Sequence, residues 1–135
     1  ECKNGNGFDG TGQYEEIYIK YDPIEKNGYG LRIESTAAND GKVNFALYQY
    51  KNGNETVVSE VYSSDAFRPG CEITLEADKD ILNAFITYDD GENFSDLELR
   101  AKIKENSYGG FGFKHMAEAT EGYRCYIKKM VVTYM

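Results

Sequence analysis

The stretch that decides the fold runs from Gly28 to Tyr62 and reads GYGLRIESTAANDGKVNFALYQYKNGNETVVSEVY. Apolar and polar side chains alternate in it, first around Leu31 and Ile33. The alternation continues through a second run around Phe45 and into a third run that ends near Tyr62. A period of two is typical of strands with one buried face and one wet face. The stretch is therefore predicted to form three consecutive antiparallel strands.

Turn signals separate these three runs. The residues Ala38 to Gly41 follow the first run, and Lys51 to Asn54 follow the second. Both segments contain Asn and Gly, for which a positive φ costs little, so a strand can reverse there. The result is a predicted meander. Its wet face would place Arg32, Asn44 and Tyr48 side by side.

The remainder of the chain adds further strand signals. Alternation or β-favouring composition predicts strands over residues 14–22, 71–77, 82–87, 111–114 and 123–135. Residues 94–101 are interpreted as a loop or a short helical turn, and 63–69 as a connector with at most one helical turn. The Gly-rich residues 1–13 are interpreted as a loop-like N-terminal segment. About eight short strands and no helix longer than about one turn predict a single antiparallel β-sandwich domain over residues 1–135.

Length and charge limit the classes of function. A chain of 135 residues is large enough for one domain with its own core. Its 15 basic and 23 acidic residues give a net charge of −8, and no basic patch interrupts the acidic scatter. Nucleic acid is not an expected partner, because phosphate binding depends on clustered Lys and Arg. No apolar run approaches the roughly 18 to 20 residues of a membrane span, and no signal peptide is seen, which favours a mature form or an excised module.

Three cysteines, Cys2, Cys71 and Cys125, allow at most one internal disulfide. Their spacing resembles no zinc or redox motif. In the alternation of their predicted strands, Cys71 and Cys125 both occupy inward-facing positions. This favours an interpretation of both as small, buried hydrophobic side chains. The alternative is a bridge from Cys2 to one of them, which would tie down the N-terminus. The cysteines therefore leave the cellular compartment open.

Five segments, in order, resemble the strands of a known family. They are Gly28 to Arg32, Pro69 to Leu75, Ile81 to Gly91, Gly110 to Lys114 and Ile127 to Val132. Together they are similar to the concanavalin A-like jelly roll of laminin G-type domains, legume lectins and several carbohydrate-binding modules. The sequence departs from that family in two places: Cys71 lies near the place of its usual tryptophan, and Lys128-Lys129 replaces a common Asp-Asn pair.

Aromatic usage indicates a surface for sugars. The chain has twelve tyrosines, seven phenylalanines and no tryptophan. Sugar rings expose C–H faces that stack on flat aromatic rings, and their hydroxyls bond to groups such as Arg and Asn. Candidate ligand-binding residues with outward parity are Arg32, Asn44, Tyr48, Tyr50 and Phe85. The proposed contact is Tyr48 stacked on a sugar ring while Arg32 and Asn44 bond its hydroxyls.

An acidic turn is the candidate metal site. Asp89, Asp90 and Asp96 lie within eight residues, and calcium prefers six to eight oxygen ligands. The segment lacks the ligand order of an EF-hand loop. No cofactor is expected apart from a calcium ion that these residues could hold.

Catalytic patterns are missing from the sequence. Glycosidases place an acid and a nucleophile or base about 5 to 10 Å apart, whereas Glu72 and Glu76 on one strand would be about 13 Å apart. The single histidine, His115, is not accompanied by a nucleophile motif. The chain is therefore not expected to be an enzyme.

The resemblance and the aromatic face together predict a non-catalytic carbohydrate-binding module. It would recognise a polysaccharide or oligosaccharide on a sheet face and be tethered to a catalytic domain, as an appendage of a secreted, extracellular glycoside hydrolase. Neither nucleic acid nor a membrane is an expected partner. Two alternatives stay open, a calcium-dependent protein-interaction module of laminin G type and a sugar-processing hydrolase of the same fold.

Overall fold

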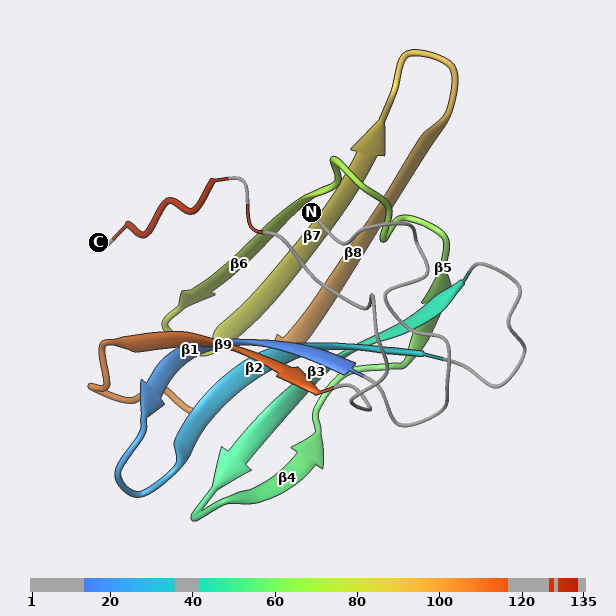
Figure 1. Ribbon diagram of the computed structural model, residues 1–135. Coiled ribbons are helices and arrows are strands. Elements are labelled where there is room, and N and C mark those ends of the chain that lie inside the picture. Colours follow the sequence, from blue (N-terminus) through green and yellow to red (C-terminus); the bar gives the residue numbers. More distant parts are fainter. Residues whose placement is uncertain (1–13, 36–41, 117–126, 128, 134–135) are drawn as a thin grey trace.

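The computed structural model describes residues 14–35, 42–116, 127 and 129–133, which form nine strands in two antiparallel sheets (Figure 1). None of these residues forms a helix, so none provides a helical membrane span. The predicted all-β sandwich is confirmed at this level. The loop-like residues 1–13 and the turn at 38–41 lie outside the described residues.

The large sheet has the strand order β4-β3-β2-β1-β9, and β5 also pairs with β3. Its strands are β1 (Tyr14–Asp22), β2 (Asn27–Ser35), β3 (Val43–Lys51), β4 (Asn54–Val57), β5 (Tyr62–Ser64) and β9 (Gly110–Met116). The meander is confirmed, except that its third run is two short strands. The reason is local: the Ser59 hydroxyl, instead of a backbone carbonyl, accepts from the Leu47 N–H at 2.8 Å, which interrupts the ladder between β4 and β5.

The small sheet has the order β6-β7-β8, with β6 (Glu72–Asp78), β7 (Ile81–Asp89) and β8 (Phe94–Lys102). The interpretation of residues 94–101 as a loop or helical turn is wrong. Leu97, Leu99 and Ala101 alternate toward the core, which is the period of a strand. The helical turn allowed within 63–69 is also not formed, since β5 reaches Ser64 and bends follow it.

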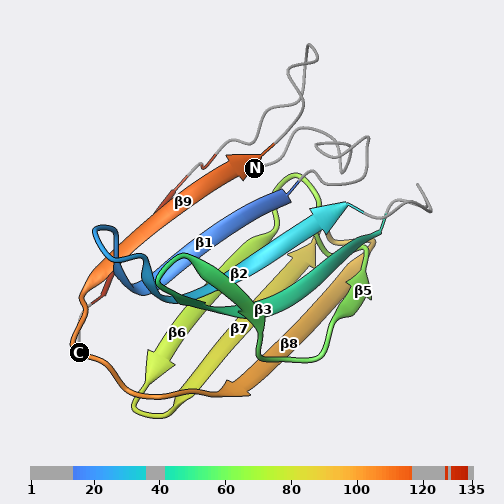
Figure 2. The ribbon, with the colours of Figure 1, turned by 90° about the horizontal axis from the view of Figure 1, so that it is seen from below.

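The core lies between the two sheets. Leu31, Ile33, Phe45 and Leu47 face inward from the large sheet and are almost fully buried. Leu82, Ala84, Ile86 and Leu99 meet them from the small sheet. Figure 2 shows the small sheet stacked beneath the large one, with β6 on the side of β9 and β8 on the side of β5. We call the opposite side of the large sheet, turned away from this core, the outer face.

The predicted closing strand over residues 123–135 is wrong where the structure describes it. Ile127 and residues 129–133 belong to neither sheet, and Ile127, Met130, Val131 and Val132 are exposed. A strand needs a hydrogen-bonded neighbour, and β-favouring composition alone does not provide one. Residues 123–126, 128, 134 and 135 lie outside the described part.

Cys71 is half-buried against the core, as its parity predicted. Cys2 and Cys125 lie outside the described residues, so the two interpretations of the cysteines both stay open.

Candidate functional site

The outer face of the large sheet carries a band of tyrosine and charged side chains. Strand register aligns its members, since Glu16 is paired with Arg32 on β2 and with Lys114 on β9. Tyr18 and Tyr48 flank Gly30 from either side in the next row. We call this band the tyrosine face. Its members are Tyr14, Glu16, Tyr18, Tyr21, Arg32, Glu34, Asn44, Tyr48, Tyr50, Glu55 and Lys114.

A buried ion pair lies at the centre of the tyrosine face. The Glu16 carboxylate is 0% exposed and Arg32 is 9% exposed, and their Oε1 and Nη2 atoms are 2.7 Å apart. The same nitrogen is 2.6 Å from Oε2 of Glu55. The Tyr50 hydroxyl donates to the other oxygen of Glu16. Burying a carboxylate is costly unless it is paired and hydrogen-bonded, and both oxygens of Glu16 are satisfied here.

The Arg32 guanidinium lies between two aromatic rings. Its central carbon is 4.4 Å from the ring centroid of Tyr14 and 4.2 Å from that of Tyr48. A cation over a ring face is attracted by the ring quadrupole, and the attraction is larger where water is excluded. Burial lowers the pKa of Arg32, but hydrogen bonds and the charges of Glu55 and Glu16 outweigh burial and raise it above its ordinary value. The cation therefore holds both rings in place.

Further tyrosine rings pack beside this pair. Tyr18 stacks on Tyr21 with centroids 4.7 Å apart and meets Tyr50 edge-on at 5.1 Å. Tyr48 and Tyr50 lie 6.5 Å apart with nearly parallel planes. Tyr21 reaches the outer face because the register shifts between Ile19 and Tyr21, next to a positive φ of 52° at Lys20.

Glycine on the neighbouring strand gives the Tyr50 ring its place. A Cβ atom on Gly30 would lie 2.8 Å from the Ile17 carbonyl oxygen and 3.1 Å from Cε2 of Tyr50. Because Gly30 has no side chain, the ring lies across β2 and its hydroxyl reaches Glu16 on β1. The ring is 5% exposed as a result.

The predicted ligand-binding residues divide between two surfaces. Arg32, Asn44, Tyr48 and Tyr50 all belong to the outer face of the large sheet, as predicted. Phe85 lies on β7 with parity opposite to the buried Ala84 and Ile86, so it faces away from the core on the small sheet. A single small ligand cannot contact Phe85 together with the other four.

Sequence reasoning missed several members of the tyrosine face. A prediction that also aligned opposite charges on neighbouring strands could have found four of them: Tyr14, Glu16, Glu55 and Lys114. Strict alternation would place Tyr21 on the core side with Ile17 and Ile19, but Tyr21 lies on the outer face against Tyr18. The bulge beside it leaves no clear mark in the sequence.

The two carboxylates beside Arg32 are close enough together to be compared with a glycosidase pair. Each has an oxygen within 2.7 Å of the same Arg32 nitrogen. The Glu16 side chain is fully buried, however, and its oxygens are already bonded to Arg32 and Tyr50. A general acid or nucleophile must reach the scissile bond, so this burial disfavours catalysis by these two residues. The side chain of the other candidate, His115 on β9, is outside the described part of the structure.

The acidic turn between β7 and β8 bonds mainly to itself. Asp90 Oδ1 accepts from the backbone N–H groups of Glu92 and Asn93 at 2.9 and 2.6 Å, which lowers its pKa. Asp89 Oδ1 accepts from the Gly91 N–H at 2.9 Å. Within residues 14–35, 42–116, 127 and 129–133, no group of three or more His, Cys, Asp or Glu side chains is arranged to hold a metal. Calcium binding by Asp89, Asp90 and Asp96 stays a prediction.

Comparison of the chain with protein-family models, with curated proteins and with solved structures finds no match in any of the three. The resemblance to the concanavalin A-like jelly roll therefore stays a prediction, and the geometry of the tyrosine face carries the functional argument.

Substitution of Gly30 by alanine should lower the free energy of unfolding by roughly 2 to 4 kcal/mol, because the new methyl group overlaps the Ile17 carbonyl and the Tyr50 ring. Urea denaturation measures the change. The matched control is Gly112→Ala, at which a Cβ would meet Tyr18 Cδ2 at an ordinary 3.4 Å. Equal stability losses in the two variants would contradict this packing.

Alkaline pH should destabilise the protein partly through Tyr50. Burial, followed by the hydrogen bond to Glu16, raises the pKa of the Tyr50 phenol above its ordinary value of 10.0. Below pH 10 the phenol is protonated in both states. Above pH 10 the unfolded chain loses this proton while the folded chain keeps it, so the free energy of unfolding falls as pH rises.

Urea denaturation between pH 9.5 and 11.5 tests this linkage. In Tyr50→Phe the fall in unfolding free energy should be shallower by up to about 1.4 kcal/mol per pH unit, the value for one proton. Tyr108→Phe is the control, since Tyr108 lies in the segment between β8 and β9 and is not part of the tyrosine face. An unchanged slope in Tyr50→Phe would show that this phenol does not keep its proton in the folded state.

Proposed function

We propose that this chain is a non-catalytic carbohydrate-binding module that holds a polysaccharide or oligosaccharide on the tyrosine face. The observation that carries the proposal is a row of half-buried rings, Tyr14, Tyr18 and Tyr48. Tyr14 and Tyr48 flank the buried cation of Arg32 and its carboxylates, and Tyr18 packs against two further tyrosine rings. Rings fixed before binding lose little conformational freedom when a ligand stacks on them. The C–H face of a sugar suits such a surface.

The proposed roles differ from the sequence prediction for Arg32, for the buried Tyr50, whose hydroxyl is bonded to Glu16, and for Phe85, which lies on the small sheet. Arg32 is committed to Glu16, Glu55 and the two flanking rings, so we propose that it positions Tyr14 and Tyr48 instead of bonding sugar hydroxyls. Polar contacts then come from the half-buried Asn44 and from Lys114, whose pKa is raised by its hydrogen bond to Tyr14.

The proposed topology and the proposed parent protein follow from the resemblance to the concanavalin A-like jelly roll. We propose that the two antiparallel sheets have the concanavalin A-like jelly-roll connection and that the domain is an extracellular appendage of a glycoside hydrolase. Four of the five segments overlap strands, namely β2, β6, β7 and β9, and together with the β-sandwich architecture they support this proposal. The segment from Ile127 to Val132 does not, because its described residues belong to neither sheet.

Affinity gel electrophoresis with a panel of soluble polysaccharides tests the function, and Tyr48→Ala tests the site. Loss of one stacking ring should weaken binding by about tenfold, the equivalent of about 1.4 kcal/mol. Tyr48→Phe keeps the ring and should keep most of the retardation.

Phe85→Ala is the matched control, because it removes an outward ring from the opposite sheet. It should leave binding unchanged. Weakened binding in Phe85→Ala but not in Tyr48→Ala would move the site to the small sheet. Absence of retardation by every polysaccharide would reject the proposed class of ligand.

A further inference from the structure

Strand β8 forms an open edge of the small sheet beside a groove. In the described part of the chain, β8 pairs with β7 along all nine of its residues and with no second strand. The groove has a volume of about 740 Å³ and lies between β8 and the segment that joins β4 to β5. Its lining residues are Val58, Ser59, Glu60, Tyr62, Glu98, Arg100, Ala101 and Lys102.

In the described part of the chain, this edge carries exposed charged side chains as its protection against strand addition and lacks other common barriers. Proteins commonly block an edge with proline, a bulge or a very short strand. The nine residues of β8 contain no proline, and their register with β7 has no shift. Every second residue of such a strand directs its backbone N–H and C=O groups away from its neighbour, in the pattern that another strand requires.

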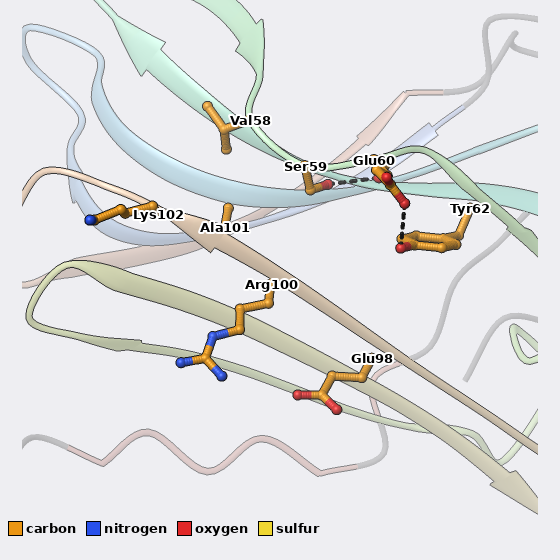
Figure 3. A pocket seen from close by; sticks show the side chains of 8 residues that line it. All are labelled: Val58, Ser59, Glu60, Tyr62, Glu98, Arg100, Ala101 and Lys102. Carbon is orange, nitrogen blue, oxygen red and sulfur yellow. Dashed lines mark hydrogen bonds between the residues drawn. The ribbon is translucent and has the colours of Figure 1, made fainter.

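Charged side chains line this edge. Glu98, Arg100 and Lys102 are exposed, and none of them forms an ion pair with another described residue. Figure 3 shows Glu98 and Arg100 extending from β8 on one side of the groove, with Ser59, Glu60 and Tyr62 on the other. The opposite wall is internally bonded, because the Tyr62 hydroxyl donates to Glu60 at 2.6 Å.

We propose that the groove binds an extended peptide segment of another protein, which adds to β8 as an antiparallel strand. Backbone groups of the edge recognise the main chain of a peptide, which a sugar does not have. Charge complementarity specifies alternate side chains: acidic residues opposite Arg100 and Lys102, and a basic residue opposite Glu98. The residues between them are apolar, since they continue the inward row of Leu97, Leu99 and Ala101.

This site is independent of the proposed glycan site. The tyrosine face lies on the outer face of the large sheet, whereas the groove lies at the β8 edge, next to the connection between β4 and β5. The two surfaces share no residue.

A labelled peptide, Val-Asp-Val-Glu-Val-Lys-Val with blocked ends, tests the proposal by fluorescence anisotropy. In antiparallel register it places Asp opposite Lys102, Glu opposite Arg100 and Lys opposite Glu98. The charge-reversed peptide Val-Lys-Val-Lys-Val-Glu-Val should bind about tenfold more weakly, because three cross-strand pairs become repulsive. N-methylation of every second amide, on the side that pairs with β8, should abolish binding.

The double variant Arg100→Glu with Lys102→Glu should reverse the preference between the two peptides. Both side chains are exposed, so the variant should keep the urea midpoint of the original protein. Equal binding of both peptides, no binding at millimolar concentration, or binding that survives N-methylation would each overturn the proposal. It would also be overturned if the protein self-associated through β8 without binding peptide, or if oligosaccharides occupied the groove in an NMR titration.

Discussion

The buried ion pair between Glu16 and Arg32 is the interaction on which the outer face of the large sheet depends. Glu16 is fully buried, and it joins Arg32 on one side to the Tyr50 hydroxyl on the other. Arg32 in turn holds the rings of Tyr14 and Tyr48. Such a pair is weak evidence for overall stability, but loss of one partner leaves an uncompensated charge and costs about 3 to 5 kcal/mol. The pair therefore fixes the geometry of the surface more than it strengthens the fold.

Most of the fold could be predicted from period-two alternation, because burial of one face leaves a direct pattern in the sequence. Where the structure differs from the predicted strands, the cause is a local hydrogen bond or the lack of a neighbouring strand. The Ser59 hydroxyl interrupts the third run of the meander, and residues 129–133 lack a strand partner in the described structure despite their composition. Residues 94–101 were interpreted as a loop or a short helical turn, although Leu97, Leu99 and Ala101 already follow the period of a strand.

The candidate site was predictable only in part, because a binding surface depends on register between strands as well as on parity within one strand. Alternation within each strand predicted that Arg32, Asn44 and Tyr48 share one face of the sheet. The register between β1 and β2 then brings Glu16 beside Arg32. Parity alone could not show that Phe85 belongs to the opposite sheet. It also could not show that Arg32 would be enclosed between two rings, since these rings come from the two neighbouring strands, β1 and β3.

A double-mutant cycle between Glu16 and Arg32 tests the central claim most directly. Glu16→Gln and Arg32→Met keep the approximate shapes of the two side chains, and urea denaturation gives the unfolding free energy of each single and double variant. We expect a coupling energy of at least about 2 kcal/mol, with the double variant more stable than the sum of the single losses implies. A coupling energy near zero would show that the two side chains act independently and would contradict the account.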